Sequence, residues 1–278
     1  MKHKVARRIA LVVEYVGTAY AGFQRQAGSP TIQAELERAI ERLTGVCTRI
    51  KAAGRTDAGV HAVGQVVAFD TESKLAVARF VRGLNHYLPD EIAVCEAHEA
   101  SLTFDPRHDA RARVYRYVFA ERTVRSPIRR RFTHAVGRRL DLESMREALI
   151  GIEGDRDFGP FSGAYPAQKS TRRMMYRTCI ERVEGETGPE VRLELEATAF
   201  LPQQVRRIAA ALLQVGLGKL TIAAFQALAD SGIRGAAEQV LAPNGLSLRA
   251  VRYATPLAGG EIEMDEGSYA AATRNQAH

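Results

Sequence analysis

The chain has 278 residues, of which 46% are hydrophobic and 26% are charged. These proportions are typical of a globular protein, and no apolar run approaches the roughly 20 residues that a membrane-spanning helix requires. The cysteines and histidines are scattered, without C-x-x-C, H-x-x-x-H or H-E-x-x-H spacing, so we predict neither a disulfide framework nor a metal site. The three cysteines are Cys47, Cys95 and Cys179.

The net charge is +7, and arginine supplies most of the positive charge. Arginine presents a planar fork that suits phosphates and stacks on bases. Basic residues cluster at Arg111 and Arg113, at 125–131, at 169–173, and at Arg206 and Arg207. A solvated basic face would explain one such cluster, whereas four together favour an RNA partner.

The first half of the chain is expected to alternate strands and helices. Residues 1–17 are basic and then apolar, but Glu14 and the lack of a small-residue cleavage site argue against a signal peptide. We therefore predict a first strand over 7–15 and a cytoplasmic protein. The spacing of Ile32, Leu36, Ile40 and Leu43 predicts a helix, with Ser29 or Thr31 as N-cap and Gly45 as its end. The next predicted elements are strands over 47–53 and 64–71, a helix over 77–87 that ends before Pro89, and a strand over 91–97.

The second half shows the same alternation. Its predicted elements are a strand over 112–120, a helix over 141–150, strands over 175–183 and 190–199, helices over 203–215 and 222–229, and a closing strand after Asn244–Gly245. The two sets meet near Asp105–Pro106. We therefore predict an N-terminal half over 1–105, a C-terminal half over 106–255 and a flexible tail over 256–278. The pattern indicates an α+β fold of two similar halves with mostly antiparallel sheets.

The most informative segment is the loop over 51–65, in which Asp57 is the one carboxylate and lies between Gly54 and Gly59. Glycines let the backbone turn sharply and let a substrate approach closely. On composition alone, an ordinary Asx-type turn with a solvated aspartate would also fit. Neither a Walker A motif nor G-x-G-x-x-G is present, so we expect no requirement for ATP or NAD.

Several blocks resemble the tRNA pseudouridine synthase A family. Residues 54–61 (GRTDAGVH) match the family block around the catalytic aspartate, and Gly64, Gln65 and Val66 extend the match. Further similar blocks are 15–26 (Y-D-G-x-x-Y-x-G-[WF]-Q-x-Q), Asn85 with Pro89 (N-x-x-L-P), Arg107 (F-[HD]-x-R), 113–117 ([KR]-x-Y-x-Y), 157–161 (D-F-x-x-F) and 200–208 (F-L-x-x-[MQ]-V-R-x-[IM]). The chain departs from the family at Val16, Pro202 and Gln203. The resemblance covers residues 7–254.

The resemblance implies a catalytic role for three side chains. Asp57 would be the nucleophile that forms a covalent intermediate, on either the sugar or the base. Arg206 would pair with Asp57, because a guanidinium within reach favours the charged form of a carboxylate and orients it. Tyr115 would stack on the target uracil and help to remove the proton from carbon 5, although a tyrosine in an alternating strand also fits a core position.

The same resemblance assigns substrate contacts. Arg55 would fill the space left by a flipped nucleotide or bind a phosphate. The residues expected along the RNA are Phe23, Gln24, Arg25, His61, Arg107 and Tyr115, with core packing as the alternative for Phe23 and organisation of the loop for His61.

Together these features imply an enzyme of the pseudouridine synthase fold, with a basic active-site cleft between its halves. The family resemblance implies isomerisation of uridines 38, 39 and 40 in the anticodon stem-loop of tRNA, without a cofactor or a membrane, by a homodimer. Two alternatives stay open. An RNA-binding module would not need Asp57 in a basic site, and a phosphoryl-transfer enzyme would need a second carboxylate for Mg²⁺, which the loop lacks.

Overall fold

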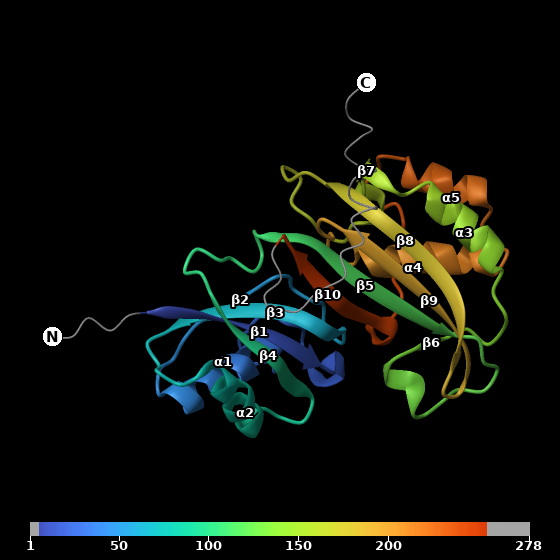
Figure 1. The fold of residues 1–278 in the computed structure, drawn as a ribbon. Helices are drawn as coiled ribbons and strands as arrows, with labels where there is room; N and C mark the ends of the chain where they lie inside the picture. Colours follow the sequence, from blue (N-terminus) through green and yellow to red (C-terminus); the bar gives the residue numbers. More distant parts are fainter. Residues whose placement is uncertain (1–5, 255–278) are drawn as a thin grey trace. The chain divides into compact units, whose positions relative to one another are not determined.

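The computed structural model describes residues 6–254, so the predicted tail over 256–278 lies outside the described residues. The described chain contains five α-helices and ten strands (Figure 1). It divides into two compact units, and each is described by itself below. The first comprises residues 6–111 together with 247–254, and the second comprises residues 112–246.

The first unit is a sheet covered by two helices. Its elements are β1 (Arg7–Tyr15), α1 (Ile32–Thr44), β2 (Lys51–Ala52), β3 (His61–Thr71), α2 (Val77–Tyr87), β4 (Ile92–Ala100) and β10 (Leu246–Tyr253). The strand order is β4-β1-β3-β10, and β2 pairs with β3 farther along that strand. The pairs of β1 with β3 and β4 are antiparallel, whereas β10 runs parallel to β3, with Ser247 opposite His61.

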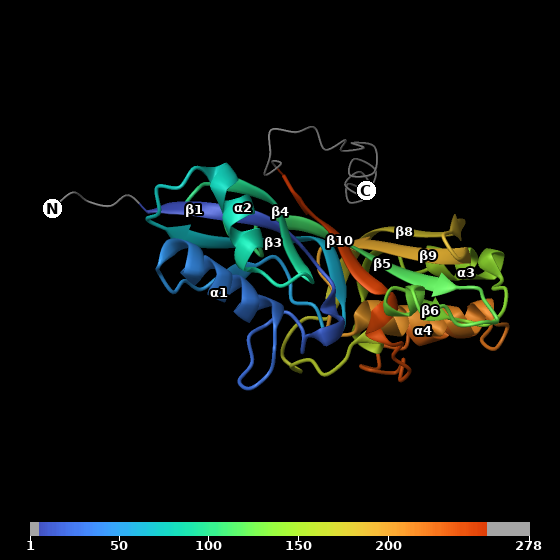
Figure 2. The ribbon, with the colours of Figure 1, turned by 90° about the horizontal axis from the view of Figure 1, so that it is seen from below.

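Strand β1 is central in this sheet because it pairs with β3 on one edge and with β4 on the other. Its alternate residues Ile9, Leu11 and Val13 are fully buried, so one face of the strand forms part of the core. Helix α1 lies on one side of β1 and β3 (Figure 2) and turns Leu36 and Ile40 into the core. Helix α2 places Phe80 against Phe69 of β3, with 5.9 Å between the ring centroids.

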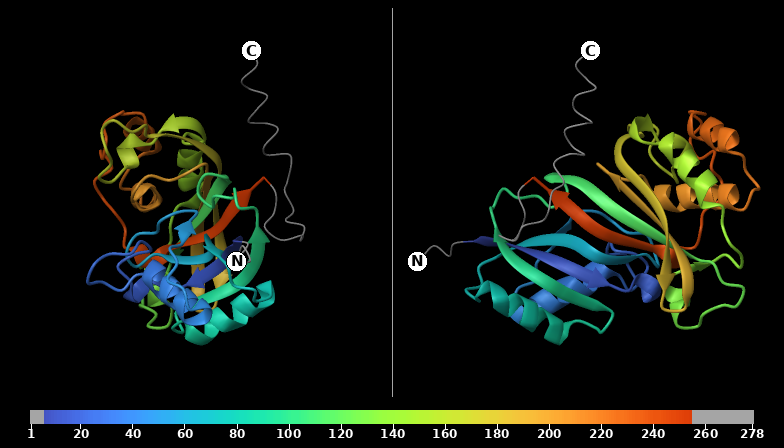
Figure 3. Two further views of the ribbon diagram at one scale, coloured as in Figure 1. Left: turned by 90° about the vertical axis from the view of Figure 1, so that its left-hand side faces the viewer. Right: turned by 45° about the vertical axis from the view of Figure 1, so that its right-hand side comes forward.

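The second unit is a mostly antiparallel sheet with three helices, in which only the short β6 runs parallel to its neighbour among the described strands. Its elements are β5 (Ala110–Ala120), β6 (His134–Ala135), α3 (Leu142–Ile150), β7 (Gly154–Asp157), β8 (Arg172–Gly185), β9 (Gly188–Ala197), α4 (Gln204–Gly216) and α5 (Ile222–Ala229). The strand order is β5-β9-β8-β7, and β6 pairs with β5. The helices α3, α4 and α5 pack on one another, with α3 against β8 (Figure 3).

The structure corrects some predicted boundaries. The strand predicted over 47–53 is reduced to Lys51–Ala52, because the backbone N–H of Ile50 donates to the Glu37 carboxylate, 3.3 Å away, instead of joining the sheet. Strand β3 begins at His61, inside the segment predicted as a loop. The sequence missed β7, whose GDRD sequence has no apolar alternation and which is a strand through its pairing with β8. Thr31, not Ser29, caps α1, since its hydroxyl accepts from the Ala34 N–H.

Candidate active site

The Asp57 loop connects β2 to β3 in the first unit. Its turn is closed by the Val60 N–H, which donates to the Asp57 carbonyl oxygen at 3.2 Å. Thr56 is 7% exposed and Val60 is 2% exposed, while Asp57 between them is half-buried. The residues on both sides of Asp57 are therefore anchored in the protein, whereas Asp57 itself lies nearer to the surface.

Buried hydrogen bonds hold this loop from beneath. The Tyr15 hydroxyl of β1 lies 2.8 Å from the Thr56 hydroxyl, and the Gln65 amide donates to the Gly54 carbonyl at 3.0 Å. Tyr15, Thr56 and Gln65 are all buried. Burial is the main cause that raises the pKa of Tyr15 to about 12, so the phenol is neutral and can donate at physiological pH.

A second segment, residues 20–23, lies directly against the Asp57 loop. The Phe23 N–H donates to the Thr56 carbonyl at 3.1 Å, and the Gly59 N–H donates to the Tyr20 carbonyl at 3.3 Å. Gly22 makes this approach possible: its φ is +102°, and an added Cβ would stand 3.0 Å from the Thr56 carbonyl oxygen. Close backbone packing therefore requires glycine at position 22 of the motif over 15–26.

The other predicted residues of the first unit divide into buried and exposed positions. Phe23 is 2% exposed and packs against Tyr15, with 6.3 Å between ring centroids. His61 is 5% exposed, and its Nδ1 accepts from the Gly17 N–H at 3.2 Å, which suits the organising role considered for it. Arg55 and Arg107 are exposed, as a residue that contacts RNA must be.

Tyr115 lies in the second unit, on β5 opposite Leu195 of β9. It is 8% exposed, and its ring meets Phe200 edge to face, with centroids 5.1 Å apart and planes 80° apart. Edge-to-face packing of this kind fixes the orientation of an aromatic ring. Two residues along the strand, Tyr117 is fully buried and its hydroxyl donates to the Ala242 carbonyl at 2.8 Å.

Arg206 lies in the first turns of α4 and is half-buried. Its Nε donates to the Leu241 carbonyl at 2.7 Å, which ties the side chain to the segment before β10. The helix begins after Gln203, the one non-glycine residue of the described chain with a positive φ, at 61°. The departure from the family pattern at this position therefore coincides with a left-handed backbone conformation.

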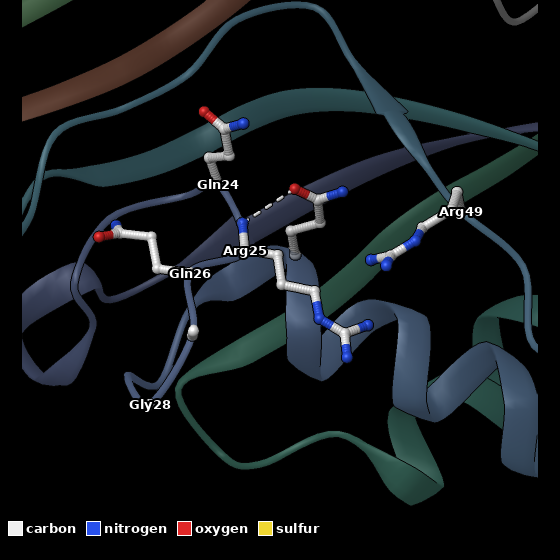
Figure 4. A pocket seen from close by; sticks show the side chains of 7 residues that line it. Gln24, Arg25, Gln26, Gly28 and Arg49 are labelled. Carbon is white, nitrogen blue, oxygen red and sulfur yellow. Dashed lines mark hydrogen bonds between the residues drawn. The ribbon is translucent and has the colours of Figure 1, made fainter.

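An open pocket lies beside the segment that contacts the Asp57 loop. Its volume is about 690 Å³, and Gln24, Arg25, Gln26, Ala27, Gly28, Gln33 and Arg49 line it (Figure 4). The predicted residues Gln24 and Arg25 thus belong to one surface. Arg49 carried no sequence signal. Glu37, on which Arg49 and Arg25 converge, had one: it lies on the face of α1 that also buries Leu36 and Ile40.

The predicted catalytic residues come from both units. Asp57 belongs to the first, and Tyr115 and Arg206 belong to the second, so the pairing of Asp57 with Arg206 stays a prediction. Within residues 6–254, no three His, Cys, Asp or Glu side chains form a group that could hold a metal ion. In the same part of the chain, no helix has the length and apolar character needed to cross a membrane.

Known proteins similar to this chain agree with one another. A family model described as tRNA pseudouridine synthase matches residues 11–109 and 148–254. The tRNA pseudouridine synthase A of Myxococcus xanthus is 40% identical over 266 residues, which are 94% of this chain and 99% of the relative. The enzymes of the same name from Geotalea daltonii and Neisseria meningitidis serogroup C are 38% and 40% identical, and each alignment covers 89% of this chain and 100% or 92% of the relative.

The similarity to solved structures is weaker. A chain in the crystal structure of a Cbf5–Nop10–Gar1 complex is 15% identical, with a TM-score of 0.33, over 74% of this chain and 45% of its own length. A likeness of that size carries no inference about this chain.

Proposed function

Because this chain belongs to the tRNA pseudouridine synthase family, an isomerase family of α+β fold, we propose that it converts uridines 38, 39 and 40 of the tRNA anticodon stem-loop, with Asp57 as nucleophile. The observation that carries the proposal is the Asp57 loop. It presents one carboxylate from a turn whose flanking residues are buried and hydrogen-bonded. Such preorganisation is what a nucleophile needs in order to meet its target at a fixed distance.

The chemistry is an isomerisation, so substrate and product contain the same atoms. The bond between N1 of uracil and C1′ of ribose breaks, the base rotates, and a bond forms between C5 and C1′. Asp57 would hold the detached fragment covalently during the rotation, through the sugar or the base. The proton on C5 then leaves and N1 gains a proton, so the balance calls for no redox partner or cofactor.

Tyr115 and Arg206 are proposed as partners in this reaction. The edge-to-face contact with Phe200 supports Tyr115 as a stacking surface, because the ring is already held in one orientation. Its phenol oxygen would help to remove the C5 proton as a relay, with one proton passing on to water as the C5 proton leaves. Arg206 would pair with Asp57, and the bond from its Nε to the Leu241 carbonyl supports this role by holding the side chain in one orientation.

The remaining contacts are proposed along the RNA. Arg55 and Arg107 are exposed and would bind backbone phosphates, with Arg55 also able to occupy the space of a flipped nucleotide. We propose that the enzyme is a cytoplasmic homodimer. Light scattering after gel filtration measures this directly, and a mass of 30.5 kDa, that of one chain, would contradict the dimer.

The decisive assay uses tRNA labelled with tritium at C5 of uridine, because isomerisation releases that tritium. We expect release with the unaltered chain and none above background with Asp57→Ala, while tRNA binding is retained. Asp70→Asn is a matched control: Asp70 lies on β3 of the same unit, where it pairs with Arg8, and this variant should release tritium normally. Equal release from the Asp57→Ala variant would disprove the role of Asp57.

The proposed positions are tested with transcripts that carry labelled uridine at a single site. Transcripts with uridine at 38, 39 or 40 should release tritium, and a transcript labelled only in the acceptor stem should not. Release from the acceptor-stem transcript alone would contradict the anticodon assignment and leave the isomerase assignment intact.

A further inference from the structure

Two arginines of the first unit share one buried carboxylate. Glu37 of α1 is 4% exposed, and its Oε2 accepts from Arg49 Nη1 at 2.8 Å and from Arg25 Nη1 at 3.2 Å. The two arginine side chains remain 51% and 66% exposed, for Arg25 and Arg49 respectively. The Glu37 carboxylate is thus buried in the protein, while both arginine side chains face the open pocket.

The positions of both arginines are fixed from the protein side. The other oxygen of Glu37, Oε1, accepts from Gln33 Nε2 at 2.9 Å and from the Ile50 N–H at 3.3 Å. The side-chain oxygen of Gln33, Oε1, in turn accepts from the backbone N–H of Arg25 at 3.0 Å. Glu37 and Gln33 therefore tie the loop before α1 and the segment before β2 to one helix.

The pocket carries more positive charge than its structural role requires. One arginine would neutralise the buried Glu37, and none of the residues that line the pocket is acidic. Each guanidinium has five N–H donors, of which a single bond to Glu37 uses one. Figure 4 shows the two guanidinium groups extending toward the same space. Since no aromatic residue lines this pocket, it suits a phosphate and not a stacked base.

The pocket is also connected to the Asp57 loop within the same unit. Phe23 donates its N–H to the Thr56 carbonyl, and the next residue, Gln24, begins the pocket lining. Movement of the pocket relative to Asp57 would break that backbone bond. A phosphate bound here is consequently held at a defined place with respect to the reacting carboxylate.

Resting on the proposed function, we propose that Arg25 and Arg49 together bind one backbone phosphate of the RNA substrate, near the nucleotide that Asp57 modifies. Planar guanidinium forks match phosphate oxygens, and two forks oriented by one carboxylate need little reordering when the RNA binds. Glu37 is a positioning residue: it orients both arginines without touching the RNA. Arg49 is the new contact, since it follows α1 in a segment outside the family motifs.

The test measures binding of an unmodified tRNA transcript as a function of salt, with single variants Arg25→Gln and Arg49→Gln. Because the two arginines are proposed to share one phosphate, each single variant should lower the slope of log K against log salt by up to about 0.7–0.9, the value for one phosphate contact. We also expect affinity to fall about tenfold near 0.1 M salt, and KM to rise while kcat at saturating tRNA is unchanged. Arg38→Gln is the matched control, because Arg38 is an exposed arginine of α1 that pairs with Glu35 and does not line the pocket.

Three results would overturn the inference. In the first, both pocket variants bind as tightly and with the same salt slope as the unaltered chain. In the second, Arg38→Gln loses as much affinity as they do, which would mean a diffuse basic surface. In the third, kcat falls with KM unchanged, which would mean that the arginines act through the Asp57 loop.

The single variants keep this test independent of folding and of the proposed reaction. Each leaves Glu37 with one arginine partner, and thermal unfolding identifies any variant whose fold is lost. If the unaltered chain released no tritium, the proposed function would fail. The salt slopes would still decide whether Arg25 and Arg49 bind an RNA phosphate.

Discussion

The hydroxyl of Tyr15 should matter both to the stability of the first unit and to the Asp57 loop. Tyr15→Phe keeps the buried ring and removes the partner of the Thr56 hydroxyl, 2.8 Å away. A buried polar group left without its partner costs about 1–3 kcal/mol. We therefore expect the free energy of unfolding to fall by that amount at pH 7. Since Thr56 adjoins Asp57, kcat for tritium release should fall about tenfold, equivalent to about 1.4 kcal/mol.

The pH dependence of stability provides a second test of the buried Tyr15 hydroxyl. Burial raises the pKa of Tyr15 from 10.0 to about 12. A raised pKa means that the folded chain holds this proton more tightly than the unfolded chain. The resulting stability is complete below about pH 10 and is lost as pH rises toward about 12, by up to about 3 kcal/mol. Tyr15→Phe lacks this loss, so its deficit should shrink over that range.

Urea unfolding followed by circular dichroism, at pH 7 and at several values above pH 9, measures both effects. Tyr87→Phe is the control, because Tyr87 of α2 is 38% exposed and its hydroxyl should contribute less than about 0.5 kcal/mol. The reasoning is refuted if Tyr15→Phe matches Tyr87→Phe in stability, or if the deficit of Tyr15→Phe is the same at pH 7 and pH 12.

Two other substitutions test close packing and buried charge. Gly22→Ala should lower the free energy of unfolding by about 1–3 kcal/mol and reduce tritium release, because the added Cβ would stand 3.0 Å from the Thr56 carbonyl oxygen. Gly28→Ala is the control and should lose less stability in thermal unfolding, because nothing lies within 4 Å of its added Cβ. Arg182→Ala should lower the free energy of unfolding by about 3–5 kcal/mol, because it removes the ion-pair partner of the Glu121 carboxylate, whose side chain is 3% exposed. Arg177→Ala is the control and should lower it by less than about 1 kcal/mol, because the Arg177 side chain is 51% exposed. Burial raises the pKa of Glu121, but its hydrogen bonds to Arg182 lower the pKa by more, so the net pKa lies below 4.5. The loss of unfolding free energy in Arg182→Ala should therefore shrink when the pH falls below that value. Deficits that are equal within either pair would contradict the reasoning.

The sequence predicted most elements, because the spacing of their apolar residues reflects the face that each helix or strand buries. The helix over 222–229 was predicted with its exact bounds, and α4 was predicted within one residue at each end. The same reasoning failed at 47–53, where residues of strand-like composition meet a carboxylate of α1 instead of a neighbouring strand. It also missed β7, since GDRD has no apolar alternation and depends on β8 for its hydrogen bonds.

The candidate site divides in the same way. Motif residues such as Asp57 and Tyr115 were identifiable as candidates, because Asp57 lies in a matching run of eight residues and Tyr115 lies in the matching block over 113–117. The position of Glu37 on the buried face of α1 was a signal, but its contact with Arg49 was not predictable, because the contact joins a helix and a loop twelve residues apart in the chain. No spacing rule predicts that contact.

The sequence by itself therefore determined the family and the order of most elements, and it singled out Asp57 as the candidate nucleophile, since each of these is encoded in contiguous residues. Only the tertiary structure decided that Tyr15 and Gln65 support the Asp57 loop, that the closing strand β10 lies parallel to β3, and that Arg25 and Arg49 converge on one acid. These features depend on atoms that are brought together by packing, and burial, which gives their hydrogen bonds and charges their strength, does not exist until the chain is folded.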